Sequence, residues 1–175
     1  MRKVNKSIDT RKLVLISVLV AQGMVLGYIE KMLPIPFIVP GAKLGLANIV
    51  TLTAVYFLNF RASAAVVLLR VLLTAVTFGS ISSFLYSLSG GVLSLMAMAG
   101  LLKVFKNEMS LISVSIIGSI SHNVGQLMVA ALIIHNVLIL TYLPFLLIVA
   151  VPTGIFVGLV AKALIQYLEK TNFIR

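Results

Sequence analysis

The chain has 175 residues, of which 61% are hydrophobic and 10% are charged, and its mean hydropathy is +1.16. This composition excludes a soluble globular domain, whose surface needs more polar residues, and indicates an integral membrane protein. The formal charge of +10 points to membrane topology before nucleic acid, because the basic residues lie mostly between apolar runs.

Six apolar runs approach the 20 or so residues that a helix needs to cross a bilayer. The first is interpreted as a retained spanning helix rather than a signal peptide, because no small-residue cleavage site follows it. The second is short and the break after the third is weak, so five spans with one re-entrant segment is the alternative. The predicted helices cover residues 12–30, 44–59, 62–79, 83–104, 110–135 and 141–168.

The predicted fold is all-α: a polytopic, multi-pass membrane protein built as a bundle of six transmembrane helices. A basic cytoplasmic tail (1–12) precedes one transmembrane domain (13–168), and a short cytoplasmic tail (169–175) follows it. With both termini cytoplasmic, eleven basic residues lie inside and two, Lys31 and Lys43, lie outside. This bias agrees with the positive-inside rule and favours six spans.

The segment LPIPFIVPGAKLGLAN, residues 33–48, interrupts the apolar pattern between the first two helices. Its prolines fix their own φ angles and push the preceding residues towards extended conformations, so the loop is stiff. The loop is too apolar for an idle aqueous connection, and we expect it to fold over the outer mouth of the bundle as a lid. The predicted lid residues are Pro34, Pro36, Phe37, Pro40 and Gly41.

Arg70 lies about eight residues into the third predicted helix, in AAVVLLRVLLTAV. Ionisable groups inside a membrane are costly, so they usually face a cavity or a partner and mark a functional site. The alternative is structural: Arg70 bonds helix carbonyls or pairs with Glu30 and holds the bundle together.

A second polar group lies on the fifth predicted helix, in GSISHNVGQL. His122 and Gln126 are four residues apart and share a face, while Asn123 lies one step round. The alternative is ordinary hydrogen bonding between helices. His135, at the outer end of the same helix, is interpreted as an interface residue.

These polar residues come from four helices, and the predicted topology places most of them at similar depth in the outer half of the membrane. We therefore expect a small-molecule pocket that opens to the outside beneath the lid and favours a ligand with anionic character. Tyr86, Ser87, Ser89, Gly90 and Gly91 are possible wall residues, although small residues often serve helix packing. The predicted substrate-binding residues are Glu30, Lys43, Asn48, Arg70, His122, Asn123 and Gln126.

Five motifs resemble a known family: EKMLPIP, PGAKLGLAN, LLRVLL, SLSGGVLS and SHNVGQ. They are similar to motifs of the bacterial Gx transporters, a family also called heptaprenyl diphosphate synthase component I. The resemblance covers nearly the whole chain after the basic tail. The family motifs fall on Glu30, Pro34, Pro40, Gly41, Lys43, Gly45, Asn48, Arg70, Gly90, His122, Asn123 and Gln126.

The resemblance implies a fold like that of the substrate-binding S-components of energy-coupling factor transporters in the bacterial cell membrane. Such a fold has six helices, a first external loop that closes over the ligand, and partner T and ATPase subunits. By resemblance, Ser17 and Ala21 on the first helix are candidate residues for docking to the T subunit. The alternative is that these small residues pack against another helix of the same chain. The resemblance does not supply the substrate.

The two names of the family belong to different function classes. A prenyl diphosphate synthase holds Mg²⁺ and diphosphate through clustered carboxylates, whereas the four acids here, Asp9, Glu30, Glu108 and Glu169, are far apart in sequence. The chain also has no cysteine for a thiol nucleophile or a thiolate metal site. We therefore predict a non-enzymatic chain without metal or cofactor, and keep a non-catalytic accessory subunit as the alternative.

The sequence has no phosphate-binding loop of the form G-x-x-x-x-G-K-[ST], and its acids lie at helix ends or in the tail. A transporter of this kind needs a partner to supply energy. The expected partners are therefore membrane lipid, a small-molecule substrate, a T subunit and ATPase subunits, and no nucleic acid. A third class, a scaffold without ligand, would have an internally satisfied polar set and no cavity.

Overall fold

The computed structural model describes residues 10–32, 43–105 and 108–171, and all the regular secondary structure of these residues is helical. Within this part there are six α-helices and one short 3-10 helix, η1, which joins the last two. Their bounds are α1 Thr10–Met32, α2 Asn48–Phe57, α3 Phe60–Phe78, α4 Ile81–Phe105, α5 Leu111–Ile134, η1 Val137–Tyr142 and α6 Leu143–Lys170.

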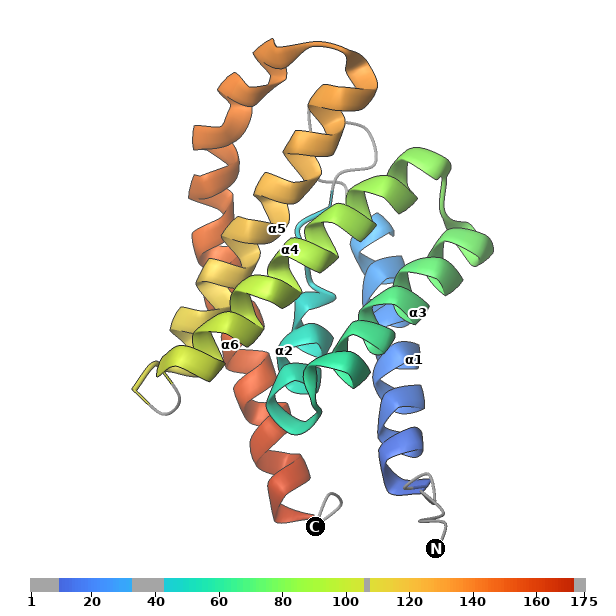
Figure 1. The fold of residues 1–175 in the computed structure, drawn as a ribbon, viewed down its shortest axis with the longest axis vertical. Coiled ribbons are helices and arrows are strands. Elements are labelled where there is room, and N and C mark those ends of the chain that lie inside the picture. The colour runs from blue at the N-terminus through green and yellow to red at the C-terminus, as the bar shows by residue number, and fades with distance from the viewer. Residues whose placement is uncertain (1–9, 33–42, 106–107, 172–175) are drawn as a thin grey trace, which may run out of the picture.

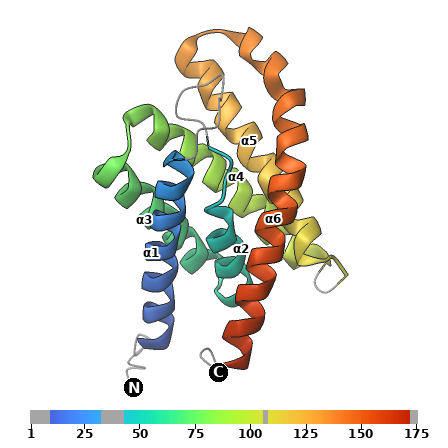
Figure 2. The same ribbon diagram turned by 180° about the vertical axis from the view of Figure 1, so that it is seen from behind.

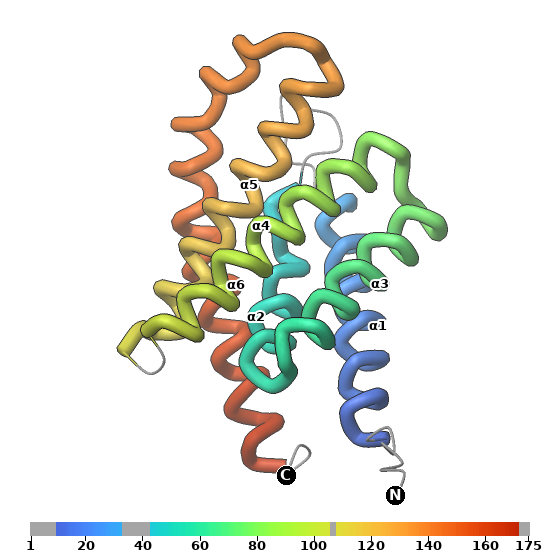
Figure 3. Tube along the Cα trace, viewed as in Figure 1, coloured from blue at the N-terminus to red at the C-terminus, as the bar shows by residue number. Residues whose placement is uncertain are grey.

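The short helix α2 lies at the centre of the bundle (Figure 1) and contacts the other five α-helices. Seen from behind, α2 lies between α1 and α6 (Figure 2). The neighbouring pairs around it are α1 with α3, α3 with α4, α4 with α5, and α5 with α6. The trace in Figure 3 shows that α1 begins and α6 ends at the same end of the molecule. This is the arrangement that an even number of passes requires.

Five of the described helical segments are long and apolar enough to cross a membrane, whereas α2 has ten residues. At 1.5 Å per residue α2 is about 15 Å long, roughly half of the hydrocarbon core. The six predicted helices are all present, but the second begins at Asn48 rather than at residue 44 and ends at Phe57 rather than at 59. The first begins at Thr10, inside the predicted tail.

The late start of α2 has a local cause at Gly45. This residue has a φ of 92°, a left-handed conformation that glycine adopts without a steric penalty. The turn closes when the backbone N–H of Asn48 donates to the carbonyl of Gly45 over 2.9 Å. Residues 43–47 are therefore irregular backbone before a buried helix, which a membrane protein tolerates where the segment lies inside protein.

The outward faces of the long helices carry exposed apolar side chains, including Val76, Ile148 and Leu132 at 84%, 71% and 71% exposure. In a bilayer these side chains contact lipid rather than water. The interior, in contrast, holds many polar groups. The buried polar residues are Glu30, Asn48, Thr51, Thr53, Ser63, Arg70, Thr74, Ser87, Ser94, Ser115, Ser119, His122, Asn123 and Gln126.

Candidate functional site

A small enclosed cavity lies where α1, α3, α4, α5 and the irregular segment 43–47 meet, and we call it the polar cavity. Its volume of about 10 Å³ is at the lower limit for one water molecule. Small-molecule sites usually measure about 300–1,000 Å³, so the described residues close around this point rather than forming an open pocket. The lining residues are Gly27, Glu30, Lys43, Gly45, Ala47, Arg70, Val71, Thr74, Ser87 and His122.

Arg70 reaches the polar cavity from α3 and is only 5% exposed. Gly23 of α1 makes room for it, because a Cβ there would lie 2.4 Å from the Arg70 Cδ. A Cβ at Gly91 of α4 would crowd Val67 at 3.0 Å and would reach Nη2 of Arg70 only at 3.4 Å, an ordinary contact distance. The Nε and Nη2 atoms are buried and have no hydrogen-bond partner. A buried guanidinium with unused donors costs free energy, and the described part of the chain supplies no hydrogen-bond acceptor for Nε and Nη2.

The Glu30 carboxylate binds backbone N–H groups rather than the Arg70 guanidinium. Its Oε1 accepts hydrogen bonds from the backbone N–H groups of Gly45 and Leu46, the second over 3.4 Å. The carboxylate attracts Arg70 electrostatically, but it makes no hydrogen bond to it. The structural alternative was a direct Arg70–Glu30 pair or hydrogen bonds from Arg70 to helix carbonyls. Neither interaction is present at Nε or Nη2 among the described residues.

His122 enters the polar cavity from α5, and neither of its ring nitrogens has a hydrogen-bond partner. The ring lies against Gly90 and Gly45. A Cβ added at Gly90 would be 2.8 Å from the His122 Nδ1, and one added at Gly45 would be 3.1 Å from its Cδ2. The glycines therefore bring the backbone of α4 and of segment 43–47 into direct contact with the imidazole.

Lys43 is held in place by α5 and α4. Its backbone N–H donates to Oε1 of Gln126 and its carbonyl accepts from Nε2 of the same side chain, both over 2.8 Å. Its Nζ donates to the Ser87 hydroxyl over 2.9 Å. Lys43 lies before α2, outside the spanning helices, and burial lowers the pKa of its ammonium group despite the nearby Glu30 carboxylate.

Three of the predicted site residues, Asn48, Asn123 and Gln126, do not line the polar cavity. Asn48 accepts a hydrogen bond from the Ser94 hydroxyl over 3.0 Å, and its Nδ2 is buried without a partner. Asn123 donates to the carbonyl of Leu146 on α6 over 3.2 Å, so its side chain joins two helices. The structure thus brings together Glu30, Lys43, Arg70 and His122, with Gln126 and Asn48 next to them, and turns Asn123 towards α6.

The sequence-based prediction missed four lining residues, Gly27, Ala47, Val71 and Thr74, and did not place Gly45 at the cavity. Thr74 follows Arg70 by four residues, so it shares the same face of α3, and that spacing could have found it. Ser87, named only as a possible wall residue, contacts Lys43 directly.

Several other predictions concern the periphery. The lid residues Pro34, Pro36, Phe37, Pro40 and Gly41 lie outside the described residues. Ser17 and Ala21 are exposed on α1, whereas Gly23 and Gly27 face Arg70 and Thr74 of α3. His135 is exposed and ends α5 in a left-handed conformation with a φ of 51°.

The free hydrogen-bonding capacity at the polar cavity consists mostly of donors. Arg70 offers Nε and Nη2, Asn48 offers Nδ2, and Lys43 carries a further ammonium charge. The single carboxylate, that of Glu30, already accepts two backbone N–H groups. Such a set matches a group rich in acceptors, and a planar guanidinium fits the two oxygens of a carboxylate or phosphate.

Comparison with known proteins places the chain in a family. The family model described as heptaprenyl diphosphate synthase component I matches residues 19–164. The chain belongs to this family. The match agrees with the resemblance that the sequence motifs carry. A comparison with curated protein sequences finds no match.

Among solved structures, the chain is similar to one described as the S component of a bacterial ECF transporter. The two share 23% sequence identity with a TM-score of 0.59, over 96% of this chain and 99% of that one. At this identity the likeness concerns the fold. The component I chain is thus an all-helical, multi-pass membrane protein with the fold of an S-component.

Proposed function

We propose that this chain is the membrane substrate-binding subunit of an energy-coupling factor type transporter, with the polar cavity as its ligand site. The observation that carries the proposal is that Nε and Nη2 of the buried Arg70 and the ring nitrogens of the buried His122 make no hydrogen bond to the described residues, at one enclosed point of an S-component fold. A scaffold without ligand would have satisfied these groups internally, because each unmatched buried donor costs about 1–3 kcal/mol.

The ligand carries an anionic group, a carboxylate or a phosphate, that replaces the missing partners of Arg70. The Lys43 ammonium group and the Nδ2 amide group of Asn48 attract the same anionic group. The substrate-binding set that we retain is Glu30, Lys43, Asn48, Arg70 and His122, with Gln126 as the anchor of Lys43 and Asn123 as a neighbour that holds α6.

Binding requires that the polar cavity enlarge, because about 10 Å³ does not admit a small molecule. Segment 43–47 moves to make this space, because it is not part of a helix. The side chains of Glu30 from α1 and Gln126 from α5 hold it in place. The pocket opens on the outer side under the loop 31–43, in the orientation with both termini cytoplasmic. Displacement of segment 43–47 links this loop to the ligand site.

Energy comes from partner subunits, because the sequence has no nucleotide-binding loop. A T subunit and ATPases are the expected partners. Ser17 and Ala21, which are exposed one turn apart on α1, leave a shallow surface on which a partner helix can approach closely.

The family description supports a second candidate, a non-catalytic accessory subunit of heptaprenyl diphosphate synthase in isoprenoid or menaquinone biosynthesis. A catalytic role is not proposed: in the described residues no three potential metal-ligating side chains lie together, and Glu30, Glu108 and Glu169 belong to different parts of the bundle. An accessory subunit would use the same membrane fold to handle a prenyl chain.

Affinity purification from native membranes in mild detergent tests the two candidates. The transporter proposal predicts co-purification with a T subunit and ATPases, and loss of that complex when Ala21→Phe fills the exposed face of α1. Val76→Phe is the matched control, because Val76 is 84% exposed on α3. Co-purification with a soluble, aspartate-rich prenyltransferase whose turnover rises in the complex would favour the accessory subunit instead.

A further inference from the structure

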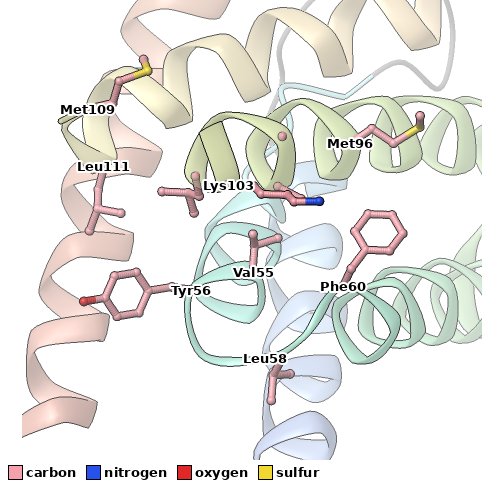
Figure 4. Close-up of a pocket in the computed structure, with 11 residues that line it drawn as sticks. Val55, Tyr56, Leu58, Phe60, Met96, Lys103, Met109 and Leu111 are labelled. Atoms are coloured by element: carbon pink, nitrogen blue, oxygen red, sulfur yellow. The ribbon is translucent and has the colours of Figure 1, made fainter. Parts of the chain in front are cut away.

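A second and larger hollow lies away from the polar cavity, and we call it the apolar groove (Figure 4). Its volume is about 980 Å³, and it is open to the surroundings of the bundle. It is formed by the end of α2, the start of α3, the last turns of α4 and the start of α5. The lining residues are Val55, Tyr56, Leu58, Phe60, Met96, Ala99, Gly100, Leu102, Lys103, Met109 and Leu111.

The walls of the apolar groove are mostly aliphatic and aromatic, and among the described residues that line it Lys103 alone is charged. Lys103 is exposed and makes no hydrogen bond or ion pair with the described part of the chain, and in the view of Figure 4 its amino group lies between Phe60 and Met96. Arg61, next to Phe60 at the start of α3, adds a second positive charge at this end of the bundle.

The described acids at this end lie on the other side of the groove: Glu169 accepts a hydrogen bond from the Tyr56 hydroxyl over 2.8 Å, and Glu108 is exposed next to Met109. The groove therefore has an apolar interior and a positive charge on the side of Lys103.

The position of the groove along α4 fits the boundary between headgroups and hydrocarbon. Lys103 lies two residues before the end of α4, where the chain leaves the membrane, and Met96 lies seven residues earlier. That separation corresponds to about 10 Å along the helix axis. A ligand with a charged head and an apolar tail would place its head at Lys103 and its tail beside Met96 and Phe60.

We propose that the apolar groove is a binding site for one anionic phospholipid, with the phosphate at Lys103 and an acyl chain along the groove. The long apolar helices embed the bundle in a bilayer, and Lys103 is the charged side chain that the described lining presents to a lipid, since the Glu169 carboxylate is bound by the Tyr56 hydroxyl. Anionic lipids are attracted to juxtamembrane basic residues by about 1 kcal/mol each. The bound lipid fills the space between α2, α4 and α5 and supports the contact of α2 with α4.

Native mass spectrometry of the full chain tests this proposal, after delipidation and addition of phosphatidylglycerol or phosphatidylcholine of the same acyl composition. We expect one retained phosphatidylglycerol and a preference over phosphatidylcholine that falls about fivefold in Lys103→Gln. Lys162→Gln is the matched control, since Lys162 is exposed on α6 and does not line the groove.

Gly100 provides a second, independent variant. A Cβ added there has no neighbour within 4 Å, so Gly100→Leu places its side chain in the path of the acyl chain and starts from open space. This variant should retain neither lipid while keeping the thermal unfolding temperature of the lipid-free protein. Val104→Phe is the matched control, because Val104 is 71% exposed and does not line the groove.

Three outcomes would overturn the lipid proposal. The first is equal retention of phosphatidylglycerol and phosphatidylcholine by the wild type. The second is unchanged retention in both Lys103→Gln and Gly100→Leu. The third is a change of oligomeric state in Gly100→Leu without loss of lipid, which would make the groove an interface between copies of the chain.

Discussion

The side-chain amide of Gln126 and the backbone of Lys43 are joined by two reciprocal hydrogen bonds, each 2.8 Å long. The Gln126 amide thus satisfies both the backbone N–H and the carbonyl of Lys43, which lies in a non-helical segment. Together with Glu30, which accepts from Gly45 and Leu46, it holds segment 43–47 against the polar cavity. The segment is thus held by the side chains of Glu30 and Gln126, from α1 and α5.

Gln126→Leu should free segment 43–47. The variant leaves the N–H and carbonyl of Lys43 without partners, which costs about 1–3 kcal/mol of stability. Hydrogen–deuterium exchange should show faster exchange at residues 43–47 and unchanged exchange in α3. Ser121→Ala is the control, because the Ser121 hydroxyl bonds only to the carbonyl of Ile117 in its own helix. Equal exchange rates at residues 43–47 in the variant and the wild type would show that the Gln126 side chain does not hold this segment.

Arg70 and Glu30 should differ in their effects on stability. Arg70→Ala removes a buried charge whose Nε and Nη2 have no partner, so we expect stability to stay equal or to rise. Glu30→Leu leaves the N–H groups of Gly45 and Leu46 unsatisfied and should cost about 1–3 kcal/mol, whereas Glu30→Gln keeps one acceptor and should cost less. Thermal unfolding in detergent measures both. If Arg70→Ala abolishes expression and Glu30→Gln restores it, the two residues form a structural pair.

Gly154→Ala should separate α5 and α6. An added Cβ would lie 2.6 Å from the backbone Cα of Ile116, which cannot move without shifting α5. We expect a loss of about 1–3 kcal/mol. Gly100→Ala is the control because nothing lies within 4 Å of its added Cβ, and it should be neutral or slightly stabilising. Similar unfolding temperatures for the two variants would contradict the close α5–α6 packing.

The sequence predicted the helices well because lipid imposes one requirement, a long apolar run, that is easily recognised. The exception is α2. Its apolar residues begin at Leu44, but Gly45 adopts a positive φ and the side chains of Glu30 and Gln126 take over the backbone bonds of the preceding residues. The residues that make these contacts are separated by 15 and 83 positions in the sequence, so a local pattern does not reveal the contacts.

The polar site could be predicted in part for a related reason. Arg70 and His122 stand out because a membrane helix has little reason to carry them. Asn123 was grouped with them on spacing alone, and its contact with Leu146 depends on where α6 lies. The need for glycine at position 23, where a side chain would collide with Arg70, follows only from how closely α1 and α3 pack. The enclosed volume depends on all five elements at once and has no sequence signature.

The membrane orientation is tested by single cysteines, since the chain has none. Leu138, 73% exposed between α5 and α6, belongs to the end predicted to be external, and Glu108, exposed between α4 and α5, belongs to the end predicted to be cytoplasmic. An impermeant thiol reagent on intact cells should label Leu138→Cys and not Glu108→Cys. Both should react after permeabilisation. The opposite pattern in intact cells would place the polar cavity near the cytoplasmic side.

The central claim is that the polar cavity binds an anionic small molecule through Arg70. It is tested most directly by mass spectrometry of small molecules that co-purify with the wild-type protein and with Arg70→Gln. Lys31→Gln is the control, because Lys31 donates to the carbonyl of Phe78 at the end of α3 and does not line the cavity. We predict a stoichiometric ligand with a carboxylate or phosphate in the wild type and in Lys31→Gln, and its loss in a folded Arg70→Gln. A ligand without an anionic group, or equal occupancy in Arg70→Gln, would contradict the account.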